Sequence, residues 1–299
     1  MRDRRASPRL PSVPSYPEAP PGWTAVRRRK VGPFTIHVTY RRADGGTTEW
    51  HSRAHRKRAS LLSRSGRSGW WAPAQASFWI GVLFAVGSAC FVVAPFPGFV
   101  SLVGAAADAA VFFAGSLFFT AAAALQYLEA VNADRGPAGH GARRRLRVFA
   151  FEPRRIDWWA TIVQLAGTLL FNLSTFGALQ TGLSTAAENR VIWAPDVLGC
   201  IAFLVASALA WAEVCGGAAC RPRREPEWWI AAVNLAGSVA FGVAAVASFV
   251  VPATGSVLDL AAANFMTVVG ALGFLAGALF LLREGASARI TRPMVPARA

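Results

Sequence analysis

Six long runs of apolar residues fill most of the chain from residue 77 onward, and none of them contains a charged residue. A helix that crosses a bilayer needs roughly 17 to 25 such residues. Five runs have this length, whereas the fourth has only 16 residues, between Asp196 and Glu213. The pattern predicts an all-α membrane protein whose six transmembrane helices follow these runs. They are Ser77–Ala94, Ala109–Leu128, Trp158–Leu179, Val197–Ala212, Trp228–Val251 and Leu260–Leu282.

Composition and charge strengthen this interpretation. The 299 residues are 54% hydrophobic and only 16% charged, yet the formal net charge is +15. A soluble nucleic-acid-binding protein would spread its basic residues through the fold, and a disordered chain would lack the apolar mass, so we expect neither. Of the 31 Lys and Arg residues, 30 lie in four alternate segments: before the first run, after the second, after the fourth and after the sixth. The positive-inside rule then predicts that all six runs cross the cell (inner) membrane, with both termini cytoplasmic.

The first 76 residues carry 16 Lys and Arg but no long apolar run. Residues 1–33 are rich in proline and arginine, which predicts a disordered tail. Residues 34–76 form a basic cytoplasmic region in which Phe34–Tyr40 and Thr47–His51 predict a small β-hairpin, with a turn at Asp44-Gly45-Gly46. We expect this region to contact anionic lipid headgroups or an acidic protein partner. Residues 285–299 are expected to be a second cytoplasmic tail.

A motif recurs three times without a gap in the odd-numbered runs: aromatic-Trp-x7-Gly-Ser/Thr-x2-Phe. A glutamate follows each even-numbered run within two residues, and a phenylalanine stands ten residues before each of these glutamates. The repeats indicate three αα-hairpins in the same orientation, over residues 77–129, 156–213 and 226–284, within a transmembrane domain of residues 77–284. We interpret the tryptophans as boundary anchors and the glycines as close helix contacts. These packing residues are Trp79, Gly87, Trp159, Gly167, Trp229 and Gly237.

The motif, followed by a second helix such as Phe113-Ala-Gly-Ser-Leu-Phe-Phe119, resembles the YrhK-like membrane proteins, a family of small helical hairpins. The resemblance covers about residues 77–284 and leaves the N-terminal region outside it. It implies a helical membrane fold, but it implies no activity and no functional residue. The excess of arginine over lysine, 29 to 2, and the many alanines are typical of a GC-rich bacterial genome.

Polar residues within the apolar runs are the first candidates for a function, because such residues are costly in lipid. One interpretation is a polar pathway for a small solute or ion, with a ring of three glutamates at the cytoplasmic end. The other is that the amides hydrogen-bond between helices and the glutamates pair with arginines. The candidates are Gln164, Asn172, Asn234, Glu129, Glu213 and Glu284.

Neither the cysteines nor the histidines predict a metal site or a cofactor. Cys215 and Cys220 stand at the cytoplasmic end of the fourth run, where a reducing compartment argues against a disulfide. His37 and His51 can approach each other in the hairpin, but no acidic or thiol partner is evident for them. Enzyme motifs such as a phosphate-binding loop or a nucleophile elbow are absent from the sequence.

Two classes of function follow. The first is a non-enzymatic, solidly packed scaffold or envelope-associated membrane protein, and the second is a transporter or channel for a small solute or ion at the interface of the three hairpins. The absence of paired Pro or Gly breaks between the repeats favours the first class.

Overall fold

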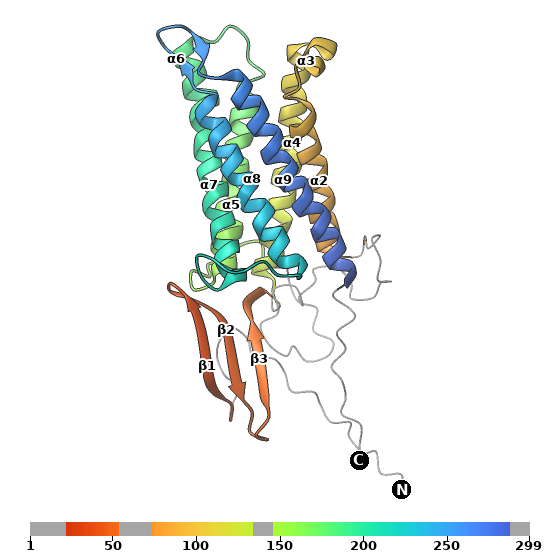
Figure 1. Cartoon of the computed structure of the whole chain (residues 1–299), viewed down its shortest axis with the longest axis vertical. Coiled ribbons are helices and arrows are strands. Elements are labelled where there is room, and N and C mark those ends of the chain that lie inside the picture. The colour runs from red at the N-terminus through yellow and green to blue at the C-terminus, as the bar shows by residue number, and fades with distance from the viewer. Residues whose placement is uncertain (1–21, 54–72, 74, 134–145, 288–299) are drawn as a thin grey trace.

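A computed structural model of the chain describes residues 22–53, 73, 75–133 and 146–287, with side chains up to residue 283 in the last helix. A long helical bundle stands on a small β-sheet (Figure 1). We call the end of the bundle beside this sheet the sheet end, and the opposite end the far end.

Six helices are long and apolar enough to cross a membrane, as the sequence predicts. The fourth is longer than expected, because α6 and the π-helical turn η1 continue directly into α7 and give one helix of 31 residues over Thr185–Cys215. The bundle helices are α2 (Ala76–Val93), α4 (Ala105–Val131), α5 (Ile156–Gly177), α7 (Ala194–Cys215), α8 (Pro226–Ala247) and α9 (Leu260–Ser287). Smaller elements at the far end are α3 (Pro97–Val103), α6 (Thr185–Glu188), η1 (Asn189–Trp193), β4 (Val250–Val251) and β5 (Ser256–Val257).

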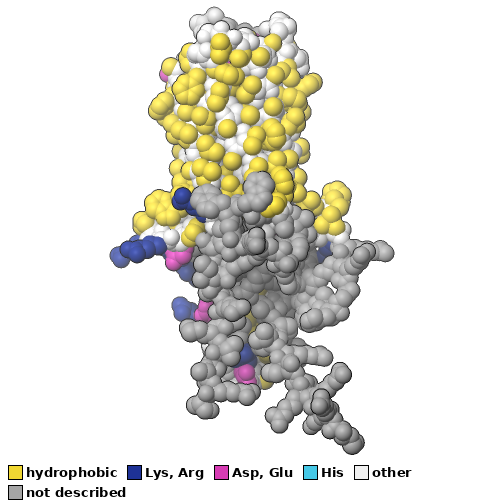
Figure 2. All heavy atoms as spheres, turned by 90° about the vertical axis from the view of Figure 1, so that its right-hand side faces the viewer, with side chains coloured by type: hydrophobic (Ala, Val, Ile, Leu, Met, Phe, Trp, Pro, Cys, Tyr) yellow, Lys and Arg dark blue, Asp and Glu magenta, His cyan; other side chains and the backbone are white. Residues whose placement is uncertain are grey.

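The six long helices close into a ring. Each packs mainly against two neighbours, in the order α2, α4, α5, α7, α8 and α9, and α9 packs back against α2. The six helices therefore surround a common axis. Figure 2 shows apolar side chains covering the outside of this ring, with most charged side chains on that face gathered toward the sheet end.

Six phenylalanines fill the centre of the ring, and all are at least 94% buried. Phe91, Phe171 and Phe241 form one layer, in which each pair of ring centroids lies 6.2–6.3 Å apart. Phe119, Phe203 and Phe274 form a second layer at 5.6–6.3 Å. The two layers are in contact within the helix pairs α2/α4, α5/α7 and α8/α9. In each pair the phenylalanine of the first helix lies 5.0–5.6 Å, between ring centroids, from the phenylalanine of the second. We call this two-layered cluster the aromatic prism.

Glycines set the distance between the two helices of each pair. A Cβ at Gly87 would lie 2.9 Å from the carbonyl oxygen of Gly115, and a Cβ at Gly237 would lie 2.8 Å from that of Gly270. Gly167 faces Gly199 in the same way, at 3.2 Å. The two helices of each pair therefore approach each other closely at these glycines. Their partner glycines stand 14 residues before Glu129, Glu284 and Glu213, respectively.

The two consecutive aromatic residues at the start of α2, α5 and α8 have the same arrangement in all three helices. Trp79, Trp159 and Trp229 are 36–44% exposed at the sheet end, and each packs edge-on against the aromatic residue before it. Trp79 Nε1 donates to Pro73 O and Trp159 Nε1 donates to Pro153 O, both at 3.0 Å. A half-exposed indole at a helix end is typical of a membrane-boundary anchor.

The sheet has three strands, β1 (Thr24–Val31), β2 (Phe34–Arg41) and β3 (Thr47–His51), in this spatial order. The predicted hairpin of β2 and β3 is confirmed, but the expectation of disorder throughout residues 1–33 was wrong, because β1 lies there. Gly32, at φ +51°, allows the tight connection from β1 to β2. The four cations Arg27–Lys30 interrupt apolar alternation, which conceals this strand in the sequence.

The described side chains that contact the sheet end of the bundle include Arg29 of β1 and two residues that follow β3 directly. Ser52 Oγ donates to Glu213 Oε1 at 2.5 Å, and Arg53 Nε lies 3.6 Å from Glu227 Oε2. Arg29 donates from a guanidinium nitrogen to the carbonyl oxygen of Cys215 at 3.0 Å.

Cys215 and Cys220 form a disulfide, contrary to the expectation from the sequence. Helix α7 ends at Cys215, and the left-handed conformation of the next residue, Gly216 (φ +67°), turns the chain back. The Cα atoms of the two cysteines thereby come within 5.2 Å, which suits a disulfide. The sequence argument used only the expected compartment and could not anticipate this turn.

Candidate functional site

A cavity of about 160 Å³ lies on the axis of the bundle at its sheet end. Side chains from all six long helices line it, and Phe274 of the aromatic prism is among them. Arg53, which follows β3, also lines it. The polar lining from the helices consists mainly of Gln126, Glu129, Gln164, Glu213 and Asn234.

The structure brings together four of the six polar residues that the sequence pointed to. Glu129 and Glu213, at the ends of α4 and α7, share the cavity with Gln164 of α5 and Asn234 of α8. Asn172 does not line this cavity, although its Oδ1 is buried without a hydrogen-bond partner in the described part of the chain. Glu284 belongs to α9, but its side chain lies outside the described residues.

Two amide oxygens in this cavity lack a hydrogen bond within the described part of the chain: Gln126 Oε1 and Asn234 Oδ1. A buried acceptor without a donor is costly, so each would gain from a ligand that donates a hydrogen bond or carries positive charge. Asn234 lies directly against Gly277 of α9, where a Cβ would collide with its Oδ1. The amide thus occupies space that the missing side chain of Gly277 provides.

A second cavity, of about 380 Å³, lies on the other side of the aromatic prism. Phe91, Phe171 and Phe241, the far layer of the prism, contribute to its lining. Its carboxylates are Glu188 and Asp196, and hydroxyls from Ser174, Thr175, Ser248 and Thr267 also line it. Among the described residues of its lining there is no Lys or Arg.

The aromatic prism separates the two cavities. The space left among Phe91, Phe119, Phe171, Phe203, Phe241 and Ser116 is only about 10 Å³. This is at the lower limit of the volume that holds one water molecule, and the site offers almost no polar partner, so it is dry. The axis therefore has a polar cavity on each side of a dry, aromatic barrier.

Sequence reasoning missed the far cavity and Gln126. In the sequence Asp196 only marks the beginning of the fourth apolar run, and the far cavity depends on contacts among several helices that no local pattern reveals. Gln126 had a local signal, because it precedes Glu129 by three residues and so lies on the same helix face.

Hydroxyl pairs join neighbouring helix pairs around the axis. Ser116 of α4 and Thr175 of α5 share a hydrogen bond of 2.9 Å, and Ser207 of α7 and Ser238 of α8 share one of 2.8 Å. All four residues are buried. Such hydrogen bonds help to hold helices together where the surroundings offer no water.

Comparisons of the chain with protein-family models, curated proteins and solved structures gave no match. The class of protein therefore rests on the fold and the axial cavities alone. Together they describe a closed ring of six helices that are long and apolar enough to cross a membrane, with a small N-terminal sheet against one end.

Proposed function

We propose that this protein provides an axial path for small cations across a membrane, and that the aromatic prism closes the path in this conformation. One observation carries the proposal: a closed ring of six apolar helices surrounds two polar cavities in line with one dry constriction. Apolar constrictions between wet cavities close channels by excluding water, and opening then requires only a small displacement of the aromatic rings.

The charges of the two linings favour a cation. The sheet-end cavity has two carboxylates, Glu129 and Glu213, against the single guanidinium of Arg53 among its described residues. The far cavity has Glu188 and Asp196 without a described basic residue. Acidic linings at both mouths raise the local concentration of cations and repel anions.

The proposal includes three hairpin repeats around a pseudo-threefold axis. The nine ring contacts of the aromatic prism support it, because corresponding phenylalanines of the three helix pairs make corresponding contacts. The three glycine contacts follow the same correspondence. The resemblance to YrhK-like hairpins is part of this proposal and concerns the fold only.

We further propose that the sheet end faces the cytoplasm and that the membrane is a bacterial inner membrane. The distribution of Lys and Arg supports this orientation, since 30 of the 31 lie in segments that would be on the same side as the sheet. The proposal gives this charge asymmetry more weight than the Cys215–Cys220 disulfide at the same end, which a reducing cytoplasm disfavours.

The accessibility of single cysteines tests the axial path. The test uses a variant with its four cysteines replaced. In it, Gln164→Cys and Asn234→Cys are expected to react with a membrane-impermeant thiol reagent when it is added on the side of the sheet end, and not when it is added on the other side. Ser248→Cys, in the far cavity, is expected to react from the other side only. Leu169→Cys provides the control, because Leu169 is 51% exposed on the lipid-facing surface and lines neither axial cavity, so it is expected to remain unreactive.

If none of the three cavity positions reacts from either side, the axial path is wrong. The result would favour the alternative, a packed membrane scaffold. The specific observation in favour of that alternative is the aromatic prism itself, which leaves almost no free volume at the centre of the bundle.

The exposed cations of β1 are proposed to bind anionic lipid headgroups. Replacement of Arg27, Arg28 and Lys30 by glutamine is expected to reduce the stabilisation that anionic lipid gives by about 1 kcal/mol for each residue replaced. Thermal unfolding in lipid nanodiscs with and without anionic lipid measures this effect. Wild type and variant are expected to be alike in neutral lipid, and an equal response to anionic lipid would exclude β1 as the contact.

A further inference from the structure

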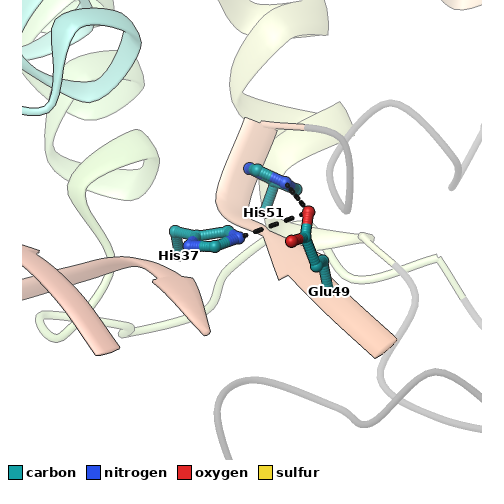
Figure 3. Close-up of side chains that lie close together, drawn as sticks. All are labelled: His37, Glu49 and His51. Atoms are coloured by element: carbon teal, nitrogen blue, oxygen red, sulfur yellow. Dashed lines mark hydrogen bonds and ion pairs between the residues drawn. The ribbon is translucent and has the colours of Figure 1, made fainter. Parts of the chain in front are cut away.

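Two histidines and one glutamate converge on one face of the N-terminal sheet (Figure 3). His37 Nε2 lies 3.7 Å from Glu49 Oε2, and His51 Nε2 lies 3.4 Å from the same oxygen. The two imidazole centroids are 4.2 Å apart. One ligand atom from each residue falls within 4.8 Å of the other two.

The strand register produces this cluster. His37 of β2 stands directly opposite His51 of β3, so the two side chains project from the same face. Glu49 precedes His51 by two residues and therefore projects from that face as well. The opposite face carries Val38, Tyr40 and Trp50, whose buried side chains form the small apolar core of the sheet. The core thus holds the backbone that positions the three polar side chains.

We propose that this face of the sheet binds a divalent transition-metal ion, Zn²⁺ by preference, through His37, Glu49 and His51. Imidazole nitrogen and carboxylate oxygen are common zinc ligands, at about 2.0–2.2 Å from the metal. In a tetrahedral site with such bonds, neighbouring ligand atoms are about 3.4 Å apart. The two measured separations, 3.4 and 3.7 Å, are close to this spacing, so an ion can enter with small side-chain movements.

The state of His37 agrees with this assignment. Its Nε2 is buried and lacks a hydrogen-bond partner within the described part of the chain, with Glu49 too distant for a hydrogen bond. Burial and then the neighbouring His51 lower the pKa of His37 below its ordinary value. The neighbouring carboxylate of Glu49 raises this pKa, and Arg27 of β1 makes a smaller contribution that lowers it.

Access to the site is open, because the side chains of His51 and Glu49 are 54% and 60% exposed. Three protein ligands leave the fourth tetrahedral position to water or to a further ligand. The site does not depend on the axial path, since none of its residues lines either axial cavity. The competing explanation is a surface ion-pair cluster that binds no metal.

Titration of the purified, chelator-treated full-length protein with Zn²⁺ tests the proposal. We expect one saturable site per chain, and we expect His51→Gln and Glu49→Gln each to weaken binding roughly tenfold or more, since even outer partners of metal ligands contribute that much. Asp44→Asn is the matched control, because it removes a carboxylate of the same hairpin outside the cluster. It is expected to bind Zn²⁺ as wild type does.

Either of two results would overturn the proposal: absence of saturable Zn²⁺ binding, or binding that both His51→Gln and Glu49→Gln leave unchanged. Both substitutions are at exposed positions, so thermal unfolding of the variants in the absence of metal is expected to match wild type. Co²⁺ serves as a second probe, because its absorption spectrum distinguishes nitrogen and oxygen ligands from cysteine sulfur. A sulfur-to-metal charge-transfer band would assign the metal to cysteine and exclude the sheet.

Discussion

Replacement of Phe171 by alanine is expected to make the protein leaky to cations and to destabilise it. In liposomes that contain a cation-sensitive dye, we expect wild type to be nearly closed and Phe171→Ala to raise the flux roughly tenfold or more. A tenfold change in rate corresponds to a barrier lowered by about 1.4 kcal/mol. Chloride flux is expected to rise much less, because carboxylates line both cavities.

The reason lies in the position of this side chain. Phe171 belongs to the far layer of the aromatic prism, lines the far cavity and stacks on Phe203 at a centroid distance of 5.0 Å. Its removal extends the far cavity into the barrier, where water can then enter. A buried phenylalanine replaced by alanine also costs about 3–5 kcal/mol of folding free energy, which chemical or thermal unfolding in detergent measures.

Phe176→Ala is the matched control. Phe176 lies on the same helix, five residues later, but it is 55% exposed and lies outside the prism. We expect its replacement to leave the cation flux at the wild-type level and to change the stability much less. If Phe171→Ala is folded and its cation flux equals that of wild type, the aromatic prism is not the barrier to cations. The proposed closure of the axial path by the prism would then be wrong.

Gly237→Ala is expected to lower the free energy of unfolding by about 1–3 kcal/mol, as overpacking of a tight contact does. The new Cβ would lie 2.8 Å from the carbonyl oxygen of Gly270 and 3.1 Å from the ring of Phe274. The carbonyl belongs to helix backbone and cannot rotate away, so α8 and α9 must separate. Unfolding of the purified protein in detergent, followed by circular dichroism, measures the loss.

Gly242→Ala, one and a half turns later on α8, is the control, because nothing lies within 4 Å of a Cβ placed there. It is expected to be neutral or slightly stabilising, since alanine favours the helix more than glycine. Gly167→Ala is expected to fall between the two, with its closest contacts at 3.0 and 3.2 Å. Equal stability of Gly237→Ala and Gly242→Ala would show that close helix approach is not required.

Much of the bundle could be predicted from the sequence because apolar run length and glycine spacing are local properties. The 16-residue run Val197–Ala212 showed the limit of this reasoning, because the π-helical turn Asn189–Trp193 precedes it without a break and makes the helix longer than the run suggests. Gln164 and Asn234 were also identifiable, since an amide within an apolar run stands out. Their meeting with Glu129 and Glu213 in one cavity depends on ring closure, which no single run encodes.

Other features depend on contacts between distant segments or on a turn. β1 could not be recognised from apolar alternation, because its central positions are four successive cations. The disulfide required the reversal at Gly216. The acidic partner of His37 and His51 was present in the sequence as Glu49, and its spacing of two residues from His51 was the available signal. This spacing places Glu49 beside both histidines only in the register that pairs His37 of β2 with His51 of β3.

The hydrogen bond from Ser52 to Glu213 connects the two proposed binding sites, the zinc site of the sheet and the axial cavity. Ser52 follows His51 directly in the chain, and Glu213 lines the axial cavity. Thermodynamic reciprocity then applies: whatever factor zinc on the sheet imposes on the affinity of the cavity for a cation, the cation imposes on the affinity of the sheet for zinc. The sheet would thereby report the occupancy of the axis, and zinc titrations at two cation concentrations can measure the size of this mutual effect without any measurement of transport.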